Sequence, residues 1–467
     1  MLRAAAVVER MGVPTASIIG SGFLKQAEVI VKGLGVALGI GVYPGAPMLD
    51  SDVELKRKVE EVLAPGLLKA LIGDEPVEAD SAIEPEPGTV VFSGDYDAVQ
   101  EHFYKNLWTD GLPVTPPTRE RVDAFLKFTD RQPEDVLRVI PQEGREASIL
   151  SIAVNAVMAG CRPEYMPILL AVVEVICTPE YKIEDAGSTP GWESLITLSG
   201  PMIKALGFNS GQGVMRVGRQ PNTSIGRFLR MFIRNVAGFT HGPEGADKGS
   251  IGQSFLVALA ENEDAVAELG WQPYSVDRGF KAGDNVVTVQ SVVAISAPAY
   301  SQSERAEEHA ALLADVIGER ACGYWTAIGM CYANWHPLII LGPSIAKVFV
   351  QDGWSKDDIR QYFCDHVKIK ASAAERYAYG AGLTGFRITN AVQEGLLPKA
   401  LYHASDDPER LVPVFQRPEW MSIVVAGDAG RNQSRGYVCN HVQGVPTSRR
   451  VVLPPNWAAL LAQTRLK

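Results

Sequence analysis

The sequence predicts an α/β protein in which a truncated, doubly wound parallel α/β domain precedes a large mixed α/β domain. Residues 1–72 alternate strand-like and helix-like apolar patterns, which is typical of a parallel sheet. The acidic, proline-rich residues 73–89 show no such period and are interpreted as a linker. The large domain, residues 90–467, mixes long apolar helices with isolated strands. With 467 residues and 46% hydrophobic content, the chain can bury a large core in two or more domains.

The N-terminal domain is expected to be a partial flavodoxin-like unit. After a short helix, the pattern predicts strands at residues 13–20 and 36–43 and helices at residues 21–33 and 51–72. Two strands are too few for a stable parallel sheet. The domain must therefore complete its sheet within the chain or against a partner.

A rigid loop is predicted from Trp108 to Thr118, because an Asp-Gly turn is followed closely by prolines. Asp110 in that turn is a candidate acid/base or ligand-binding residue. The alternative is that Asp110 is an Asx-turn residue that bonds its own backbone.

The most apolar stretch, residues 147–177, divides at residues 160–163 into two predicted buried helices. Cys161 lies at this break, where the dipole of the following helix is expected to lower its pKa and favour a catalytic thiolate. The alternative is a buried cysteine that packs as a small hydrophobic residue. Asn155 in the first helix is a candidate for lining a pocket.

The central element of the chain is residues 209–241, a glycine-rich loop followed by a helix predicted at about residues 223–236. Asn222, Thr223 and Ser224 supply capping side chains, and Gly238 marks the end. A glycine-rich loop of this kind lets backbone approach a ligand closely.

Three arginines of this helix, Arg227, Arg230 and Arg234, share one face. The functional hypothesis is a clamp on a carboxylate or phosphate, formed with Arg216 or Arg219 from the loop. The alternative is a solvated face or ion pairs with acidic residues elsewhere in the chain.

Farther along, alternation predicts a strand at residues 286–295 and an amphipathic helix at residues 304–320. A buried strand at residues 421–427 runs into the polar loop 428–434, and α/β sheets place ligands at such strand ends. Cys439 and His441 share a face of another predicted strand, but two ligands do not make a metal site, so no metal is predicted and the cofactor stays unknown.

Composition and motifs exclude several classes of protein. The net charge of -10 argues against nucleic acid or an anionic membrane surface as the main partner. No apolar run reaches the length of a membrane span, and six scattered cysteines indicate reduced thiols, so a cytoplasmic location is expected. Dinucleotide, P-loop, α/β-hydrolase and zincin motifs do not occur in the sequence.

Several segments read together resemble the UGSC family, which is named for a selenocysteine-or-cysteine, Gly, Ser, Cys motif. The resemblance covers most of the chain and is carried by these segments: 108–117, 155–163, 209–238, 260–262, 276–280 and 345–358. Residues 12–72 resemble the family's thiol domain downstream of its motif, with a looser likeness to the selenoprotein B subunits of glycine and proline reductases. The resemblance implies redox or thiol-addition chemistry on a small molecule.

The sequence departs from the family pattern at its reactive groups. No Cys-Gly-Ser-Cys occurs, residues 187–190 read Gly-Ser-Thr-Pro in place of Thr-Thr-His-Pro, and Ser275 stands where a histidine is expected. The residues suited to binding an anion remain and form, with Asn155, the predicted substrate-binding set: Asn209, Asn222, Arg227, Arg234 and Asn235.

The leading hypothesis is a subunit of a cytoplasmic small-molecule enzyme that acts on an anionic, carboxylate-bearing metabolite by thiol-assisted redox or addition/elimination chemistry, with Cys161 and Asp110 as candidate catalytic residues. One alternative is a catalytically degenerate subunit that stabilises an active paralogue. Another is a metal-dependent hydratase or hydrolase. The expected partner is a homologous subunit that carries the thiol motif, or a second copy of the chain, with neither nucleic acid nor membrane.

Overall fold

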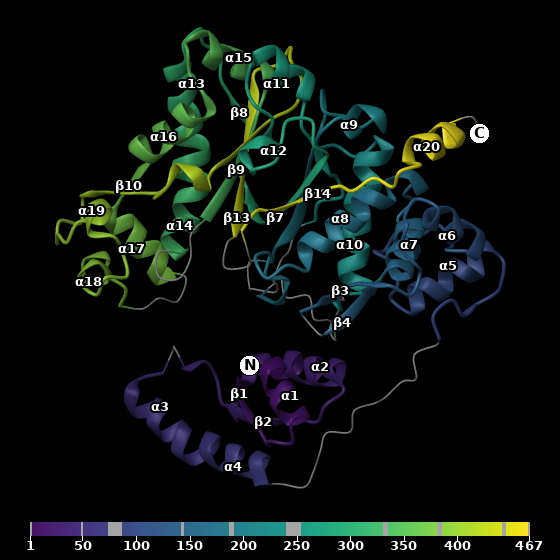
Figure 1. Cartoon of the computed structure of the whole chain (residues 1–467). Coiled ribbons are helices and arrows are strands. Elements are labelled where there is room, and N and C mark those ends of the chain that lie inside the picture. The colour runs from purple at the N-terminus through teal and green to yellow at the C-terminus, as the bar shows by residue number, and fades with distance from the viewer. Residues whose placement is uncertain are drawn as a thin grey trace.

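The computed structural model confirms an α/β protein. It describes residues 2–47, 50–72, 86–141, 144–185, 191–239, 254–329, 335–380, 385–440 and 445–465. Among these residues, no helix is long and apolar enough to cross a membrane. Two groups of strands dominate, a small parallel pair near the N-terminus and a large mixed sheet (Figure 1).

The N-terminal unit has the predicted order of strands and helices. Helix α1 (Leu2–Arg10) is followed by β1 (Ala16–Gly20), α2 (Leu24–Leu34) and β2 (Gly39–Tyr43). Strands β1 and β2 pair in parallel, with Ile18 opposite Gly41. A long helical segment then runs through α3 (Asp52–Lys58), a π-helical turn (Val59–Leu63) and α4 (Ala64–Ile72).

This unit has a hydrophobic cluster of its own, built from α1, α2 and the residues around them. Helix α4 packs closely on β2 because Gly41 has no side chain: a Cβ there would lie 2.5 Å from Leu67. The absent side chain lets helix and strand come into contact.

Residues 86–185 begin the larger unit with helices that flank a short hairpin. They are α5 (Tyr96–Lys105), α6 (Arg119–Leu126), β3 (Val136–Ile140), β4 (Arg145–Ser148), α7 (Ile149–Met158) and α8 (Met166–Ile176). The two apolar helices predicted within residues 147–177 are confirmed as α7 and α8. Their break falls where Gly160 adopts a positive φ of 78°, a backbone conformation that glycine reaches without strain.

The large sheet has the strand order β12-β9-β13-β7-β5-β6. These strands are β5 (Glu193–Ser199), β6 (Leu259–Ala260), β7 (Val286–Ile295), β9 (Trp335–Leu341), β12 (Ser422–Val425) and β13 (Gln433–Asn440), with β8 (Ala299–Tyr300) and β14 (Thr447–Arg450) pairing at the side. Pairs β5–β6 and β9–β12 are parallel and the other pairs antiparallel. The predicted strand at residues 286–295 is confirmed as β7.

The sheet curls until its two ends approach each other. The backbone N–H of Asn262, just after β6, donates to the carbonyl of Val425 at the end of β12 (2.8 Å). Alternate strand residues, such as Leu195, therefore point into a cluster enclosed by the sheet. Their neighbours, such as Ile196 and Ile339, pack under helices on the outside.

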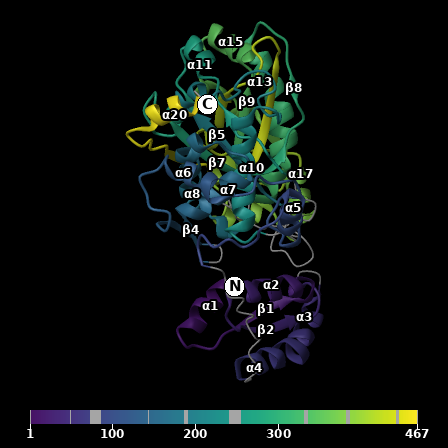
Figure 2. The same cartoon turned by 90° about the vertical axis from the view of Figure 1, so that its right-hand side faces the viewer.

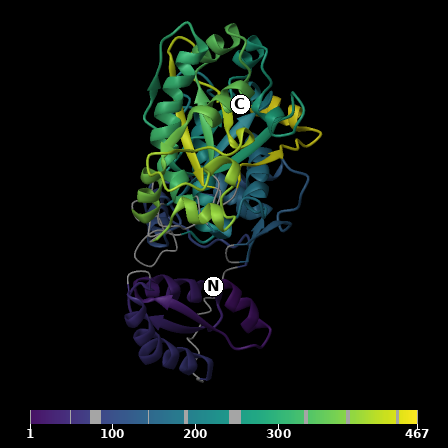
Figure 3. The same cartoon turned by 90° about the vertical axis from the view of Figure 1, so that its left-hand side faces the viewer.

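Two helix layers cover the outer surface of the sheet. Helices α7, α8 and α10 (Gln220–Asn235) lie on one side. Helices α13 (Ala306–Leu313), α14 (Gly323–Gly329) and α16 (Lys356–His366) lie on the other side, and the turned views present each layer from outside (Figures 1, 2 and 3).

The remaining elements are α9 (Met202–Ala205), α10 (Gln220–Asn235), α11 (Glu263–Leu269), α12 (Tyr274–Asp277), α13 (Ala306–Leu313), a π-helix (Ala314–Cys322), α14 (Gly323–Gly329), α15 (Pro343–Gln351), α16 (Lys356–His366), β10 (Lys368–Lys370), α17 (Ala371–Gly380), α18 (Ile388–Gln393), α19 (Lys399–Tyr402), β11 (Leu411–Pro413) and α20 (Trp457–Arg465).

Helix α10 begins three residues earlier than predicted. Pro221 fits the first turn because its missing N–H has no partner there anyway. Asn222 consequently lies inside the helix, and no side chain caps it. Gly226 is required at the centre of α10, because a Cβ there would lie 2.5 Å from the backbone nitrogen of Val257 on a crossing segment. The helix is buried on most of its surface rather than along one stripe.

Candidate functional site

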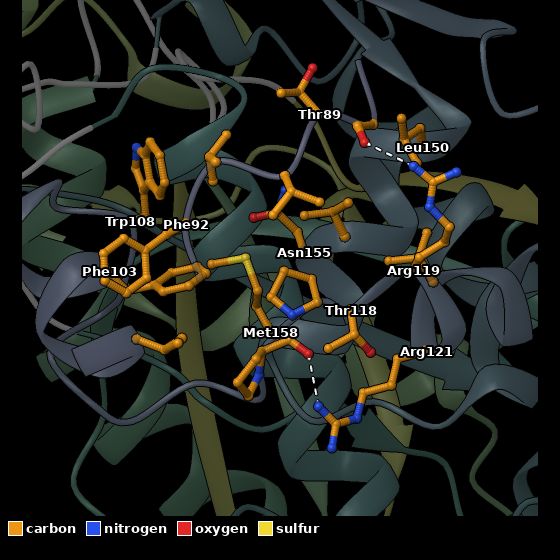
Figure 4. Close-up of a pocket in the computed structure, with 18 of the residues that line it drawn as sticks. Thr89, Phe92, Phe103, Trp108, Thr118, Arg119, Arg121, Leu150, Asn155 and Met158 are labelled. Atoms are coloured by element: carbon orange, nitrogen blue, oxygen red, sulfur yellow. Dashed lines mark hydrogen bonds between the residues drawn. The ribbon is translucent and has the colours of Figure 1, made fainter. Parts of the chain in front are cut away.

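A cavity of about 1000 Å³ lies between the extended segment 87–95, helices α5, α6 and α7, and the loop from Trp108 to Thr118. The side chains of Phe92, Phe103, Trp108 and Met158 gather on one side of it, and the guanidinium groups of Arg119 and Arg121 lie on the other (Figure 4). The cavity is therefore apolar at one end and charged at the other.

The aromatic wall of the cavity, formed by Phe92, Phe103 and Trp108, is held in place by helix α5 and its neighbours. The ring of Phe92 stacks on His102, with centroids 4.4 Å apart, and Phe103 meets Trp108 edge to face at 5.8 Å. The buried side chain of Gln100 exchanges two hydrogen bonds of 2.8 and 2.9 Å with the backbone of Val114. These bonds fix α5 against the loop that carries Trp108.

Asp110 and Arg227, both predicted as site residues, form an ion pair. Arg227 Nε and Nη2 donate to the two carboxylate oxygens of Asp110 at 2.8 and 2.7 Å, and Nη2 also donates to the carbonyl of Pro113 at 3.0 Å. Burial acts to raise the pKa of Asp110, but the hydrogen bonds and charge of Arg227 outweigh it and hold this pKa below its ordinary value. Asp110 is thus an ionised anchor for the loop, which does not suit it to donate a proton at neutral pH.

The end of α10 supports the same loop and reaches the cavity. Asn235 Nδ2 donates to the carbonyl of Trp108 at 3.1 Å and to Oδ1 of Asn155 at 2.9 Å. Arg234 Nε donates to the carbonyl of Leu107 at 2.8 Å. Asn155 and Asn235 line the cavity, whereas the buried Arg234 holds the start of the loop.

Arg227 and Arg234, which are predicted to clamp an external anion, both bind the chain itself in this structure: Arg227 pairs with Asp110, and Arg234 donates to the backbone of Leu107. The clamp on an external anion stays a prediction. Arg230 likewise pairs with Glu193. The alternative of ion pairs with acidic residues elsewhere in the chain describes Arg227 and Arg230. Arg216 and Arg219 stay exposed at the opposite end of the helix.

Asn209 and Asn222 are not part of the cavity. Asn222 is fully buried, accepts from the backbone N–H of Asn209 at 2.8 Å, and donates to the carbonyls of Asn209 and Ala258 at 3.0 Å each. These three bonds use its amide to join two loops. Asn222 lies near the start of α10 and Asn235 at its end, which places them roughly 20 Å apart at 1.5 Å of rise per residue.

Cys161 is buried at the break between α7 and α8, and its Sγ donates to the carbonyl of Ser224 at 3.2 Å. Burial raises the pKa of Cys161 to about 12, so the prediction that the helix dipole lowers it is wrong. A thiolate in a dry site loses more hydration energy than the partial charge of a helix end returns. Burial also raises the pKa values of the other described cysteines: Cys177, Cys322, Cys364 and Cys439.

His441, which is considered above as a metal ligand, and residues 187–190, where the sequence departs from the family pattern, lie outside the described residues. In the described part of the chain, no group of three or more His, Cys, Asp or Glu side chains is arranged to hold a metal ion.

The sequence did not single out Arg119 and Arg121 as residues of a site, nor Glu261 as a buried carboxyl group. Arg119 and Arg121 begin a helix directly after a proline-rich loop, and that position was the signal that could have indicated them.

Glu261 is fully buried where β6 ends. Its carboxylate accepts from Ser199 Oγ at 2.8 Å and from the N–H of Tyr274 at 3.0 and 2.9 Å. Burial raises its pKa to about 7, although the charge of Lys356 and these bonds act in the opposite direction.

The structure is that of an α/β protein with a cavity between α5, α6 and α7 that is apolar at one end and charged at the other. No protein-family model matches the chain, and neither a curated protein nor a solved structure matches it.

Proposed function

We propose that this chain binds a small organic molecule in the cavity between α5, α6 and α7, as a subunit of a cytoplasmic small-molecule enzyme. The cavity itself is the observation that carries the proposal. Its volume of about 1000 Å³ is at the upper end of the range for small-molecule sites. Aromatic rings supply apolar contact, while the amides of Asn155 and Asn235 and two guanidiniums supply the few polar groups that orient a ligand.

The chemistry that we propose is thiol-assisted redox or addition/elimination, as the resemblance to the UGSC family implies. The described cysteines do not favour this chain as the source of the thiol, because burial raises the pKa of each of them. A thiol with a pKa near 12 carries almost no thiolate at neutral pH. We therefore assign the reactive thiol to a homologous subunit that carries the family motif.

The same thiol observation favours a second candidate, a catalytically degenerate subunit that stabilises an active UGSC-type paralogue without binding substrate. Ligand binding by this chain alone separates the two candidates. Co-expression with a homologue that carries the thiol motif tests the partner in both cases. Co-elution with gain of turnover supports the partnership, and a fully active homomer contradicts it.

Ligand binding is tested by thermal-shift titration of the full chain with a panel of small metabolites. We expect at least one compound to raise the melting temperature. Phe92→Ala removes a ring from the cavity wall, so it should diminish that shift. The matched control is Phe23→Ala, which removes a ring that is 61% exposed in the N-terminal unit. A shift that is equal in both variants would place the ligand elsewhere.

A further inference from the structure

We infer that the ligand of this cavity is an amphipathic organic anion, with a ring or branched apolar body and a carboxylate or similar anion at one end. This inference rests on the proposed function and adds the chemical class of the ligand and its orientation.

The apolar body belongs against the aromatic wall. Phe92 and Phe103 expose ring surface to the cavity beside Trp108, and the flexible thioether of Met158 lies between these rings and the middle of the space (Figure 4). Aromatic rings and methionine favour flat or branched apolar groups over hydrated ones. Asn235 Nδ2 donates to Asn155 Oδ1 and to the carbonyl of Trp108, which uses both of its N–H groups and leaves Oδ1 of Asn235 to accept a hydrogen bond from a ligand.

The anionic end belongs at Arg119 and Arg121. Each guanidinium donates one hydrogen bond to a backbone carbonyl. Arg119 Nη2 donates to the carbonyl of Gly88 at 3.3 Å, and Arg121 Nη1 donates to that of Pro116 at 3.0 Å. A guanidinium carries five N–H donors in a planar fork that matches a carboxylate. In the described part of the chain neither arginine pairs with a carboxylate, whereas Arg227 and Arg230 both do.

Acidic side chains also border the cavity, and they define the competing possibility of a cationic ligand. Asp95 accepts from the backbone N–H of Ala98 at 2.8 Å and caps α5, while Asp123 and Glu134 are exposed to solvent. A cation bound with its apolar body on the aromatic wall would direct its charge toward the two arginines across the cavity. That repulsion favours the anion.

The test uses three ligands that share one body and differ only in charge: 3-phenylpropionate, 3-phenylpropan-1-ol and 3-phenylpropylamine. Isothermal titration of the full chain at neutral pH and low salt should rank the carboxylate tightest and the amine weakest. The carboxylate should bind roughly tenfold tighter than the alcohol, as expected for charge-assisted hydrogen bonds at a partly exposed site.

Variants locate the anion. The double variant Arg119→Gln with Arg121→Gln should lower the affinity for 3-phenylpropionate to that of the alcohol. It should leave the affinity for the alcohol unchanged. The control Arg216→Gln removes an exposed guanidinium from the other end of α10 and should change neither.

Each other outcome overturns a distinct statement. If the alcohol binds as tightly as the carboxylate, or the amine binds tightest, the anionic class is wrong while the cavity remains a binding site. If the carboxylate is preferred but the double variant keeps that preference, Arg119 and Arg121 are not the anion site. If none of the three binds at millimolar concentration while another compound of the thermal-shift panel does, the proposed ligand class is wrong and the proposed function stands. If no compound of the panel binds either, the proposed function fails as well.

Discussion

Glu261 is a fully buried carboxyl group where the two ends of the curled sheet meet, and its replacement by glutamine should change how stability depends on pH. Its oxygens accept from Ser199 on β5 and from the N–H of Tyr274, whose hydroxyl group hydrogen-bonds Ser422 on β12. The carboxyl group therefore links strands from both ends of the sheet.

The size of the effect follows from the two pKa values. Burial raises the pKa of Glu261 from 4.5 to about 7 in the folded chain. The folded state then binds the proton more tightly than the unfolded state, so this group stabilises the fold fully below about pH 4.5, and the contribution is lost as pH rises through 7. The linkage relation gives a loss of about 2.5 kcal/mol between about pH 5 and pH 8.

Urea denaturation of the wild type and of Glu261→Gln across this pH window measures the effect. The glutamine cannot titrate, so the difference between the two unfolding free energies should change by about 2.5 kcal/mol over the window. The matched control is Glu268→Gln, because Glu268 is exposed on the neighbouring helix α11 and its replacement should leave the pH dependence unchanged.

Parallel curves for the wild type and Glu261→Gln would refute the reasoning, because they would mean that the carboxyl group titrates alike in the folded and unfolded chains. If the wild type instead lost stability relative to Glu261→Gln as the pH falls, the pKa of Glu261 would be lowered in the folded chain and not raised.

Three further predictions concern other parts of the structure. Iodoacetamide at neutral pH should leave Cys161 unmodified in the folded chain, because burial keeps the thiol protonated; early labelling seen by mass spectrometry would contradict this. Asp110→Asn should lower the unfolding free energy by about 2 to 3 kcal/mol, because it leaves Arg227 half-buried without its counter-charge; an unchanged urea midpoint would count against the ion pair. Gly226→Ala should destabilise by about 2 kcal/mol, because the new Cβ meets Val257; a raised melting temperature, as helix propensity alone predicts, would show that the crossing segment yields.

Local patterns predicted much of the fold because periodicity depends on neighbouring residues. Alternation located β7 to the residue, and the order of strands and helices in residues 2–72 follows from short apolar runs. The start of α10 was misplaced because a capping signal at Asn222 competed with Pro221, and the fold uses the asparagine to join two loops instead.

The candidate site depended on contacts that the sequence does not display. Asp110 lies 117 positions before Arg227, and no periodic pattern links an acidic turn to a basic helix at that distance. The buried thiol of Cys161 donates to the carbonyl of Ser224, which lies 63 positions later on a different helix. Residues 87–89 were assigned to a linker because they lack any period, yet they line the cavity, and the carbonyl of Gly88 accepts a hydrogen bond from Arg119.

The cavity wall at residues 87–95 is also the stretch of backbone that follows directly after the connection to the N-terminal unit. While Phe92 is stacked on His102, residues 86–92 belong to the larger unit and add nothing to the length of chain that separates it from Ile72, the last described residue of the N-terminal unit. If residues 86–92 detach from the cavity, the chain between the two units becomes longer by about seven residues, which is at most roughly 25 Å when fully extended. Ligand binding at Phe92, as we propose, would therefore limit how far the N-terminal unit can move from the larger unit. By reciprocity, a force that separates the two units would lower the affinity of the cavity for its ligand.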